Sequence, residues 1–218
     1  CLVLAGGTGF YVAALEHGLD EMPNVPAEIR AAVAADYQLH GLAYLVEQLR
    51  TQDPASYAGL DLANRARVMR AVEVLRASGR PFSSFKSQRQ RPLPDIPLIK
   101  IGLLTPREVL YARLNTRVEA MITRGLVEEV EALLAQGYGP ELPALQSIGY
   151  AEVVRYLQGG YDSLKSMVEA LQQNTRHYAK RQLTWVRNQH KAHQATSDIA
   201  WFAPEDITSI FNYLEAHL

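Results

Sequence analysis

Helical periodicity dominates this 218-residue chain and is interrupted by only a few short apolar runs. In most segments apolar residues recur every three or four positions, which is the spacing of an amphipathic helix. Residues 1–5 form a short apolar run and residues 97–104 a mostly apolar run, of the kind found in buried parallel strands. Residues 200–204 suggest one last edge strand. The pattern therefore predicts an α/β protein that is mostly helical overall.

The strand-like runs are separated by a stretch with helical patterning alone. Residues 1–20 and 96–218 hold the runs and form the expected core, and residues 21–95 form the expected all-helical insertion. Within the insertion we expect helices over 26–37, 41–53 and 63–80, a turn-rich connection over 53–60, and a Pro-rich loop over 84–97. Within the core we expect helices over 105–125, 126–137, 175–191 and 205–218, and another from Tyr150 onward. The three acidic side chains Glu128, Glu129 and Glu131 are expected to be solvated.

Composition narrows the class of protein. The net charge of −1 and the pI near 6.7 exclude a globally basic nucleic-acid coat protein, so any nucleic-acid site must be local. The single cysteine, Cys1, excludes an internal disulfide framework and is typical of a reducing cytoplasm. No stretch approaches 18 uninterrupted apolar residues, so we expect no membrane partner and a cytoplasmic location.

A basic helix over residues 175–191 is the strongest local signal. No Asp or Glu occurs from Ala170 to Ser197. At about 100° per residue, four cations lie within about 60° of one another: Arg176, Lys180, Arg187 and Lys191. Solvated faces usually mix both signs of charge, so a one-signed face favours binding of a phosphate backbone over plain solvation. Tyr178 and Trp185 fall on the opposite side and are expected to pack on the core, although Trp185 could also stack on a base.

Two further patterns suggest anion binding. The turn GGTGFY, residues 6–11, places glycines where the backbone must approach something closely and puts the Thr8 hydroxyl near a helix N-terminus; a plain helix cap is the alternative. Arg113 and Arg117 are one turn apart and can point at one anion. Arg67 and Arg70 also lie side by side, but their spacing alone favours a role in surface solubility.

The motifs together resemble one family. GGTGFY, ARVMRAVEV, YARLNTRVEAM, SIGYAE and AKRQLTWVR occur in the order and rough spacing of the tRNA dimethylallyltransferases, up to about Arg187. The resemblance implies transfer of a dimethylallyl group from dimethylallyl diphosphate to N6 of the adenosine 3′-adjacent to the anticodon. It also implies a core like that of the P-loop nucleotide kinases, with a helical insertion that grips the anticodon stem-loop. A base inside a stacked loop must be flipped out before it can react.

The resemblance also implies roles for individual residues. Thr8 and Arg117 are the expected catalytic residues and contact the diphosphate, with Arg113 as a weaker candidate. Thr8 is also expected near the target adenosine. The remaining expected tRNA contacts are Arg30, Arg67, Arg70, Gln146, Ser147, Gly149, Tyr150, Arg176, Lys180, Arg181, Gln182 and Arg187.

The chain departs from the family pattern in one respect. The family has a GxxxxGK[ST] phosphate loop followed by an acidic residue that serves as the base, and no GK[ST] occurs in these 218 residues. Because the chain opens at Cys1 in an apolar run, we expect a fragment that begins inside a domain. Because these residues lack the phosphate loop, the base and the strand that should lie centrally in the sheet, we expect them to be inactive alone and only marginally stable. Mg²⁺ is expected as a cofactor from the resemblance alone, and we expect a monomer. A small-metabolite kinase of the P-loop type and a non-catalytic RNA-binding module remain the alternatives.

Overall fold

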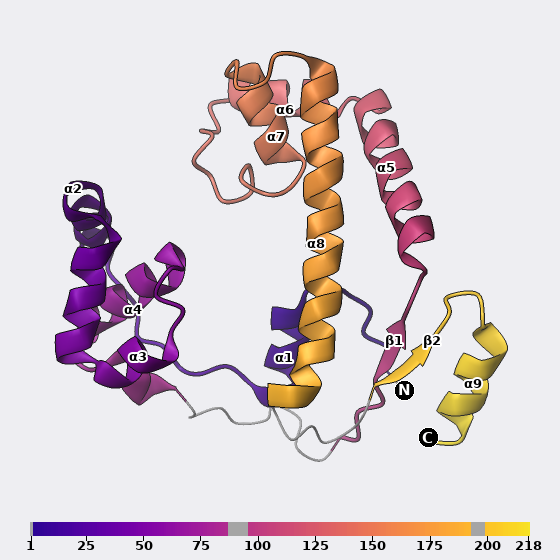
Figure 1. Ribbon diagram of the computed structural model, residues 1–218, viewed down its shortest axis with the longest axis horizontal. Helices are drawn as coiled ribbons and strands as arrows, with labels where there is room; N and C mark the ends of the chain where they lie inside the picture. Colours follow the sequence, from indigo (N-terminus) through magenta and orange to yellow (C-terminus); the bar gives the residue numbers. More distant parts are fainter. Residues whose placement is uncertain (1, 87–95, 193–198) are drawn as a thin grey trace. The chain divides into compact units, whose positions relative to one another are not determined.

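The computed structural model describes residues 2–86, 96–192 and 199–218. Figure 1 shows the helices of the chain and its small sheet. The chain separates into two compact units, which we call the sheet unit, Cys1–Gly9 with Pro97–Leu218, and the helical unit, Phe10–Ile96. Among the described residues no helix combines the length and the apolar character needed to cross a membrane.

The helical unit is built on two amphipathic helices. Its elements are α1 (Gly9–His17), whose first residue belongs to the sheet unit, α2 (Ala27–Gln52), α3 (Pro54–Gly59), α4 (Arg65–Ser78) and the 3₁₀ turn η1 (Phe82–Phe85). The two helices expected over 26–37 and 41–53 meet within α2 at Gly41, whose φ of 76° is not helical. Leu45 and Leu49 of α2 pack against Val68 and Val72 of α4, and all four are fully buried. Full burial of each leucine contributes about 1.5–3 kcal/mol.

The segment expected to be a turn-rich connection is the helix α3. Asp53 caps it by accepting a hydrogen bond from the Ser56 backbone N–H at 3.1 Å, and Pro54 occupies its first position. The cap and the proline start a helix, so the prediction of a connection without helix was wrong. Most of the Pro-rich loop expected next, residues 87–95, lies outside the described residues.

The sheet unit is mostly helical around a small parallel sheet. Its elements are β1 (Ile101–Leu103), α5 (Arg107–Thr123), α6 (Leu126–Ala135), α7 (Tyr150–Leu157), α8 (Leu164–Ala192), β2 (Ala200–Phe202) and α9 (Ile207–Glu215). β1 pairs in parallel with β2, with Gly102 opposite Trp201. The long helix α8 packs against α5 and α7 (Figure 1), around a core that includes Val118, Val130, Val153, Met167 and Leu171. The expected mostly helical α/β architecture with a parallel sheet is confirmed.

Two strand predictions fail in detail. Residues 2–5 form no strand, and Leu2, Val3 and Leu4 are largely exposed. An apolar run becomes a strand only when a neighbouring strand supplies hydrogen-bond partners, and no described segment pairs with this one. The run 97–104 forms a strand only over β1, and the 57% exposure of Leu103 shows that this strand is not buried.

Candidate functional site

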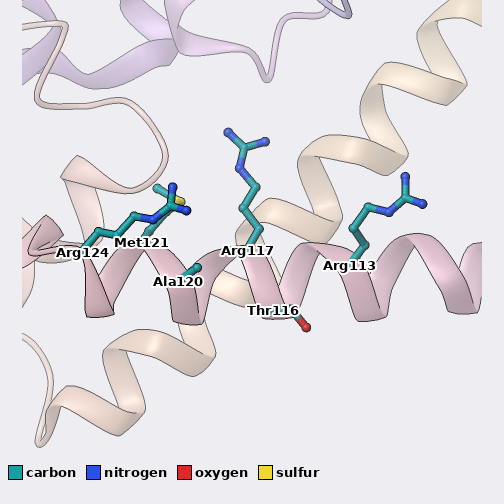
Figure 2. Close-up of a pocket in the computed structure, with 6 residues that line it drawn as sticks. All are labelled: Arg113, Thr116, Arg117, Ala120, Met121 and Arg124. Carbon is teal, nitrogen blue, oxygen red and sulfur yellow. The ribbon is translucent and has the colours of Figure 1, made fainter.

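An open hollow of about 610 Å³ lies on α5 and contains three arginines (Figure 2). Its lining residues are Arg113, Thr116, Arg117, Ala120, Met121 and Arg124. Spacings of four and seven residues place the three arginines within about 40° of one another around the helix. All three side chains are exposed, and none forms a hydrogen bond or an ion pair with any residue that the structure describes. Three guanidinium groups without carboxylate partners make this hollow suited to an anion.

The opposite side of α5 is fixed to α8. Val118 is 1% exposed, and the Arg176 Nη1 of α8 donates a hydrogen bond to Asn115 Oδ1 at 2.7 Å. Gln172 Nε2 donates to Glu119 Oε1 at 3.3 Å. These contacts hold the arginine face of α5 toward solvent. They also engage Arg176, which is half-buried, whereas Lys180 and Arg187 are exposed; Lys191 lies beyond the side chains that the structure describes.

The glycine turn expected to make a close approach lies against α8. The Gly7 carbonyl accepts a hydrogen bond from Gln182 Nε2 at 2.9 Å, and a Cβ atom at Gly7 would collide with that amide. A Cβ atom at Gly9 would overlap the indole ring of Trp185, so this ring packs on the backbone there. Thr8, between the two glycines, is exposed. The close approach therefore serves to dock the Thr8 turn on α8.

A second hollow, of about 500 Å³, lies along α8. It is lined by His177, Lys180, Arg181, Thr184, Trp185 and Asn188. The Arg181 guanidinium lies 5.7 Å from the centre of the Tyr178 ring, a cation–π arrangement. Tyr178 is 39% exposed, so the prediction that it packs on the core was wrong; the Gly7–Gly9 turn covers the same side of α8 one to two turns farther on, at Gln182 and Trp185.

A tight turn at Gly149 connects α7 to α8 through a buried carboxylate. Gly149 has a φ of 103°, which glycine adopts readily. Its N–H donates to Glu152 Oε2 at 2.7 Å, and Asn174 Nδ2 of α8 donates to Glu152 Oε1 at 2.7 Å. Glu152 is only 5% exposed, and both of these donors are neutral. The carboxylate thus fixes the turn relative to the basic helix.

The side chains around the Gly149 turn differ in their exposure and in their hydrogen bonds to the rest of the protein. Gln146 and Ser147 are exposed, and Ser147 Oγ donates to the Ala144 carbonyl at 2.7 Å. Tyr150 is half-buried, and its hydroxyl donates to Glu129 Oε1 at 2.6 Å. That hydrogen bond raises the pKa of Tyr150, because losing the proton would leave an anion beside a carboxylate. Glu129 is exposed, as predicted, but its carboxylate also accepts this hydrogen bond from Tyr150.

The three arginines expected to contact tRNA from the helical unit have different environments. Arg30 of α2 and Arg67 of α4 are exposed, and neither side chain has a partner among the described residues. Arg70 lies 3.5 Å from Glu73 Oε2, an ion pair one turn apart. Arg30 and Arg67 are therefore the freer of the three to meet an external phosphate.

Sequence reasoning missed several residues of the site. Arg124 lies seven positions after Arg117, a spacing that could have added it to the row on α5. Glu152 stands in the quoted SIGYAE motif, but its partner Asn174 is 22 residues away and carries no local signal. His177, Thr184 and Asn188 share the hollowed face of α8, and the charge pattern of the sequence does not mark them.

A metal site is not formed by the described side chains. No group of three or more His, Cys, Asp or Glu residues among them could hold a metal ion. The residues present do not fit Mg²⁺, which prefers carboxylate oxygens and phosphates. The expected Mg²⁺ therefore stays a prediction, and no chemical step is assigned to it.

Comparison with known proteins gives consistent matches. The chain is 38% identical to a tRNA dimethylallyltransferase from Cytophaga hutchinsonii, with 100% of this chain and 67% of that protein aligned. It resembles the solved full-length tRNA isopentenylpyrophosphate transferase from Bacillus halodurans at 31% identity and a TM-score of 0.55, covering 96% of this chain and 64% of that one. A eukaryotic dimethylallyltransferase acting on tRNA, at 21% identity and a TM-score of 0.66, shares the fold over 97% of this chain and 53% of its own.

The chain spans about two thirds of the length of these bacterial relatives. The family model of the IPP transferases matches residues 1–189, which include both hollows, the glycine turn and the Gly149 turn. On this match the chain belongs to the IPP transferase family.

Proposed function

We propose that the protein transfers a dimethylallyl group from dimethylallyl diphosphate to N6 of the adenosine 3′-adjacent to the anticodon in tRNA. The observation that carries the proposal is the row of unpaired arginines on α5, in a chain of the IPP transferase family. A diphosphate leaving group needs cations that are not already neutralised, and this hollow supplies them.

The reaction forms one bond to C1 of the prenyl group, breaks one bond from it, and moves one proton. The N6 nitrogen of adenosine bonds to C1 of the dimethylallyl group while the bond from C1 to the diphosphate oxygen breaks. Pyrophosphate leaves with that electron pair, and N6 loses a proton to a base. The family resemblance implies that the base is an acidic residue that follows the GxxxxGK[ST] phosphate loop. These 218 residues contain no GK[ST], so we expect this stretch alone to be inactive.

The chain's own residues then have separate tasks. Arg113 and Arg117 stabilise the charge that develops on the leaving diphosphate. Thr8 is positioned by the glycine turn docked on Gln182 and Trp185, where its hydroxyl can meet the diphosphate or the target base. The exposed cations of α8, Lys180, Arg181 and Arg187, suit contacts to RNA phosphates.

In this proposal, residues of both units contact the tRNA. The helical unit contributes Arg30 and Arg67, with Arg70 after release from Glu73, and the sheet unit contributes the surface of Gln146, Ser147, Gly149 and Tyr150. A cytoplasmic location and a monomeric state remain predictions. So does the alternative of a metabolite kinase, which would phosphorylate its substrate without RNA.

The test is a transfer assay with the full-length gene product. The reaction contains Mg²⁺, dimethylallyl diphosphate and an anticodon stem-loop, and mass spectrometry of the RNA reads the product. We expect a gain of one prenyl group that disappears when the target adenosine is replaced by guanosine. No gain in mass with stem-loop binding intact would leave an RNA-binding module, and RNA-independent use of ATP would indicate the kinase.

A further inference from the structure

The arginine row on α5 is longer than one diphosphate. With a rise of about 1.5 Å per residue, Arg113 and Arg117 lie about 6 Å apart along the helix axis, whereas Arg124 lies about 10 Å beyond Arg117. A diphosphate consists of two phosphoryl groups that share one oxygen, so the pair one turn apart matches its size. Arg124, two turns farther on, is placed to meet a different anion.

The surroundings of Arg124 indicate which anion that is. Met121 lines the hollow between Arg117 and Arg124 (Figure 2). A Cβ atom built at Gly149 would lie 3.6 Å from Met121 Cε, so this end of the hollow adjoins the Gly149 turn. The exposed Gln146 and Ser147 belong to that turn. An RNA strand carries a phosphate at every nucleotide, so a strand that contacts the turn brings phosphates toward Arg124.

A purely local role for Arg124 gives a different expectation. Arg124 is the C-cap residue of α5, and a cation there gains about 0.3–1 kcal/mol from the helix dipole. That role affects only stability. The Arg124 guanidinium makes no hydrogen bond to any residue in the described part of the chain, and it lines the same hollow as Arg117.

We propose that Arg124 is an RNA-phosphate site at the end of the α5 hollow, next to the diphosphate site of Arg113 and Arg117. The inference rests on the proposed function. It assigns the two ends of one arginine row to two substrates, the prenyl donor and the RNA. The row would therefore place the RNA beside the leaving group.

Two ligands, an anticodon stem-loop and inorganic pyrophosphate, distinguish the Arg124 end of the row from the Arg113 and Arg117 end. Binding of an anticodon stem-loop to the full-length protein is measured over a series of salt concentrations, and binding of inorganic pyrophosphate is measured by calorimetry. For Arg124→Ala we expect weaker RNA binding, a salt slope of log K reduced by about 1, and unchanged pyrophosphate affinity. For Arg113→Ala we expect weaker pyrophosphate binding. Lys165→Ala is the matched control, because Lys165 is an exposed cation of α8 outside both hollows.

Each outcome bears on the assignment. An unchanged salt slope in Arg124→Ala, or a loss of pyrophosphate affinity in its place, overturns it, and a change in unfolding temperature alone would leave only the helix-cap role. Arg124→Lys should restore most of the salt slope, since it keeps the charge. If no prenyl transfer occurs but the Arg124 effect on RNA binding persists, the proposed function fails and the phosphate site stands. Absence of RNA binding by the unaltered protein overturns both.

Discussion

Two sets of arginines, one in each unit, have opposite environments. In the helical unit, Arg76 donates to Asp36 Oδ2 at 2.7 Å and to Gln48 Oε1 at 2.8 Å, tying α4 to α2. Arg50 donates to Glu47 through two nitrogens. In the sheet unit, the three arginines of the α5 hollow have no such partner among the described residues. A paired arginine stabilises the fold, whereas an unpaired row remains available for an external anion.

Carboxylates show the complementary arrangement. The buried Glu152 of the sheet unit is bound by the neutral donors Gly149 and Asn174, although arginines lie on the neighbouring helix α5. Had Glu152 faced an arginine of the hollow, each would have neutralised the other. Because the buried carboxylate is bound by neutral donors, the arginine row keeps its positive charge. Substitutions of the paired and unpaired arginines, and of Glu152 and Asn174, test this comparison.

The largest effect is expected from Arg117→Ala. Loss of a cation that stabilises the leaving diphosphate should lower the rate of prenyl transfer by about 10²–10³-fold, with little change in stability. Arg76→Ala is the paired counterpart: it should lower the free energy of unfolding by about 1–3 kcal/mol and leave the transfer rate of folded protein nearly unchanged. Single-turnover kinetics and urea unfolding measure the two quantities. If Arg117→Ala unfolded the protein and Arg76→Ala removed transfer, the distinction between paired and unpaired arginines would be wrong.

A swap at Glu152 and Asn174 should have the next largest effect. Asn174→Asp sets a second carboxylate against Glu152 and removes a donor, which should lower the free energy of unfolding by about 2–3 kcal/mol. Adding Glu152→Gln should restore most of it, because the new amide donates to the introduced carboxylate while its oxygen accepts from the Gly149 N–H. Glu152→Gln alone should cost little, since the Asn174 amide can turn over. Urea midpoints of the single and double variants decide the matter, and a double variant as unstable as Asn174→Asp alone would contradict this account.

Much of the helical framework could be predicted from local pattern. The spacing of apolar residues predicted α2, α4, α5, α6, α8 and α9, and the pair Arg113 and Arg117 was predicted to point the same way, as Figure 2 shows. α3 was missed because Asp53 and Pro54 were interpreted as turn residues, although the same two residues cap and start a helix. Helix signals are local, so a helix can be predicted from its own residues without knowledge of the rest of the chain.

Properties that depend on distant partners could not be predicted in the same way. The apolar run 2–5 has strand composition, but pairing is decided by a neighbouring strand that a local pattern cannot supply. Asn174 became part of the site only through Glu152, and Arg176 was interpreted as a free cation because its partner Asn115 is 61 residues away. The family motifs indicate where the candidate site lies, whereas these long-range contacts determine which of its residues are free.

The smallest expected effect concerns Asp53, the helical unit's counterpart of Glu152. Asp53 is 1% exposed; this burial raises its pKa, but hydrogen bonds from Ser56 and Ser83 outweigh it, and the pKa lies below its ordinary value. Because the folded pKa is lowered, the stabilisation is present above the unfolded pKa and is lost as the pH falls through the folded pKa. In Asp53→Asn, the free energy of unfolding should therefore fall less steeply as the pH is lowered below about 4.

The control for Asp53 is the exposed pair of Glu47 and Arg50. The hydrogen bond from Arg50 also lowers the pKa of Glu47, so Glu47→Gln should change the acid limb in the same direction. Its change should be smaller, because solvent screens the exposed pair, whereas Asp53 joins α3 to η1 through Ser83 Oγ at 2.6 Å. Urea unfolding at a series of pH values gives both slopes. An equal change in the two variants would show that a buried carboxylate held by neutral donors stabilises the fold no more than an exposed ion pair does. The stabilising role given to Glu152 would then fail as well.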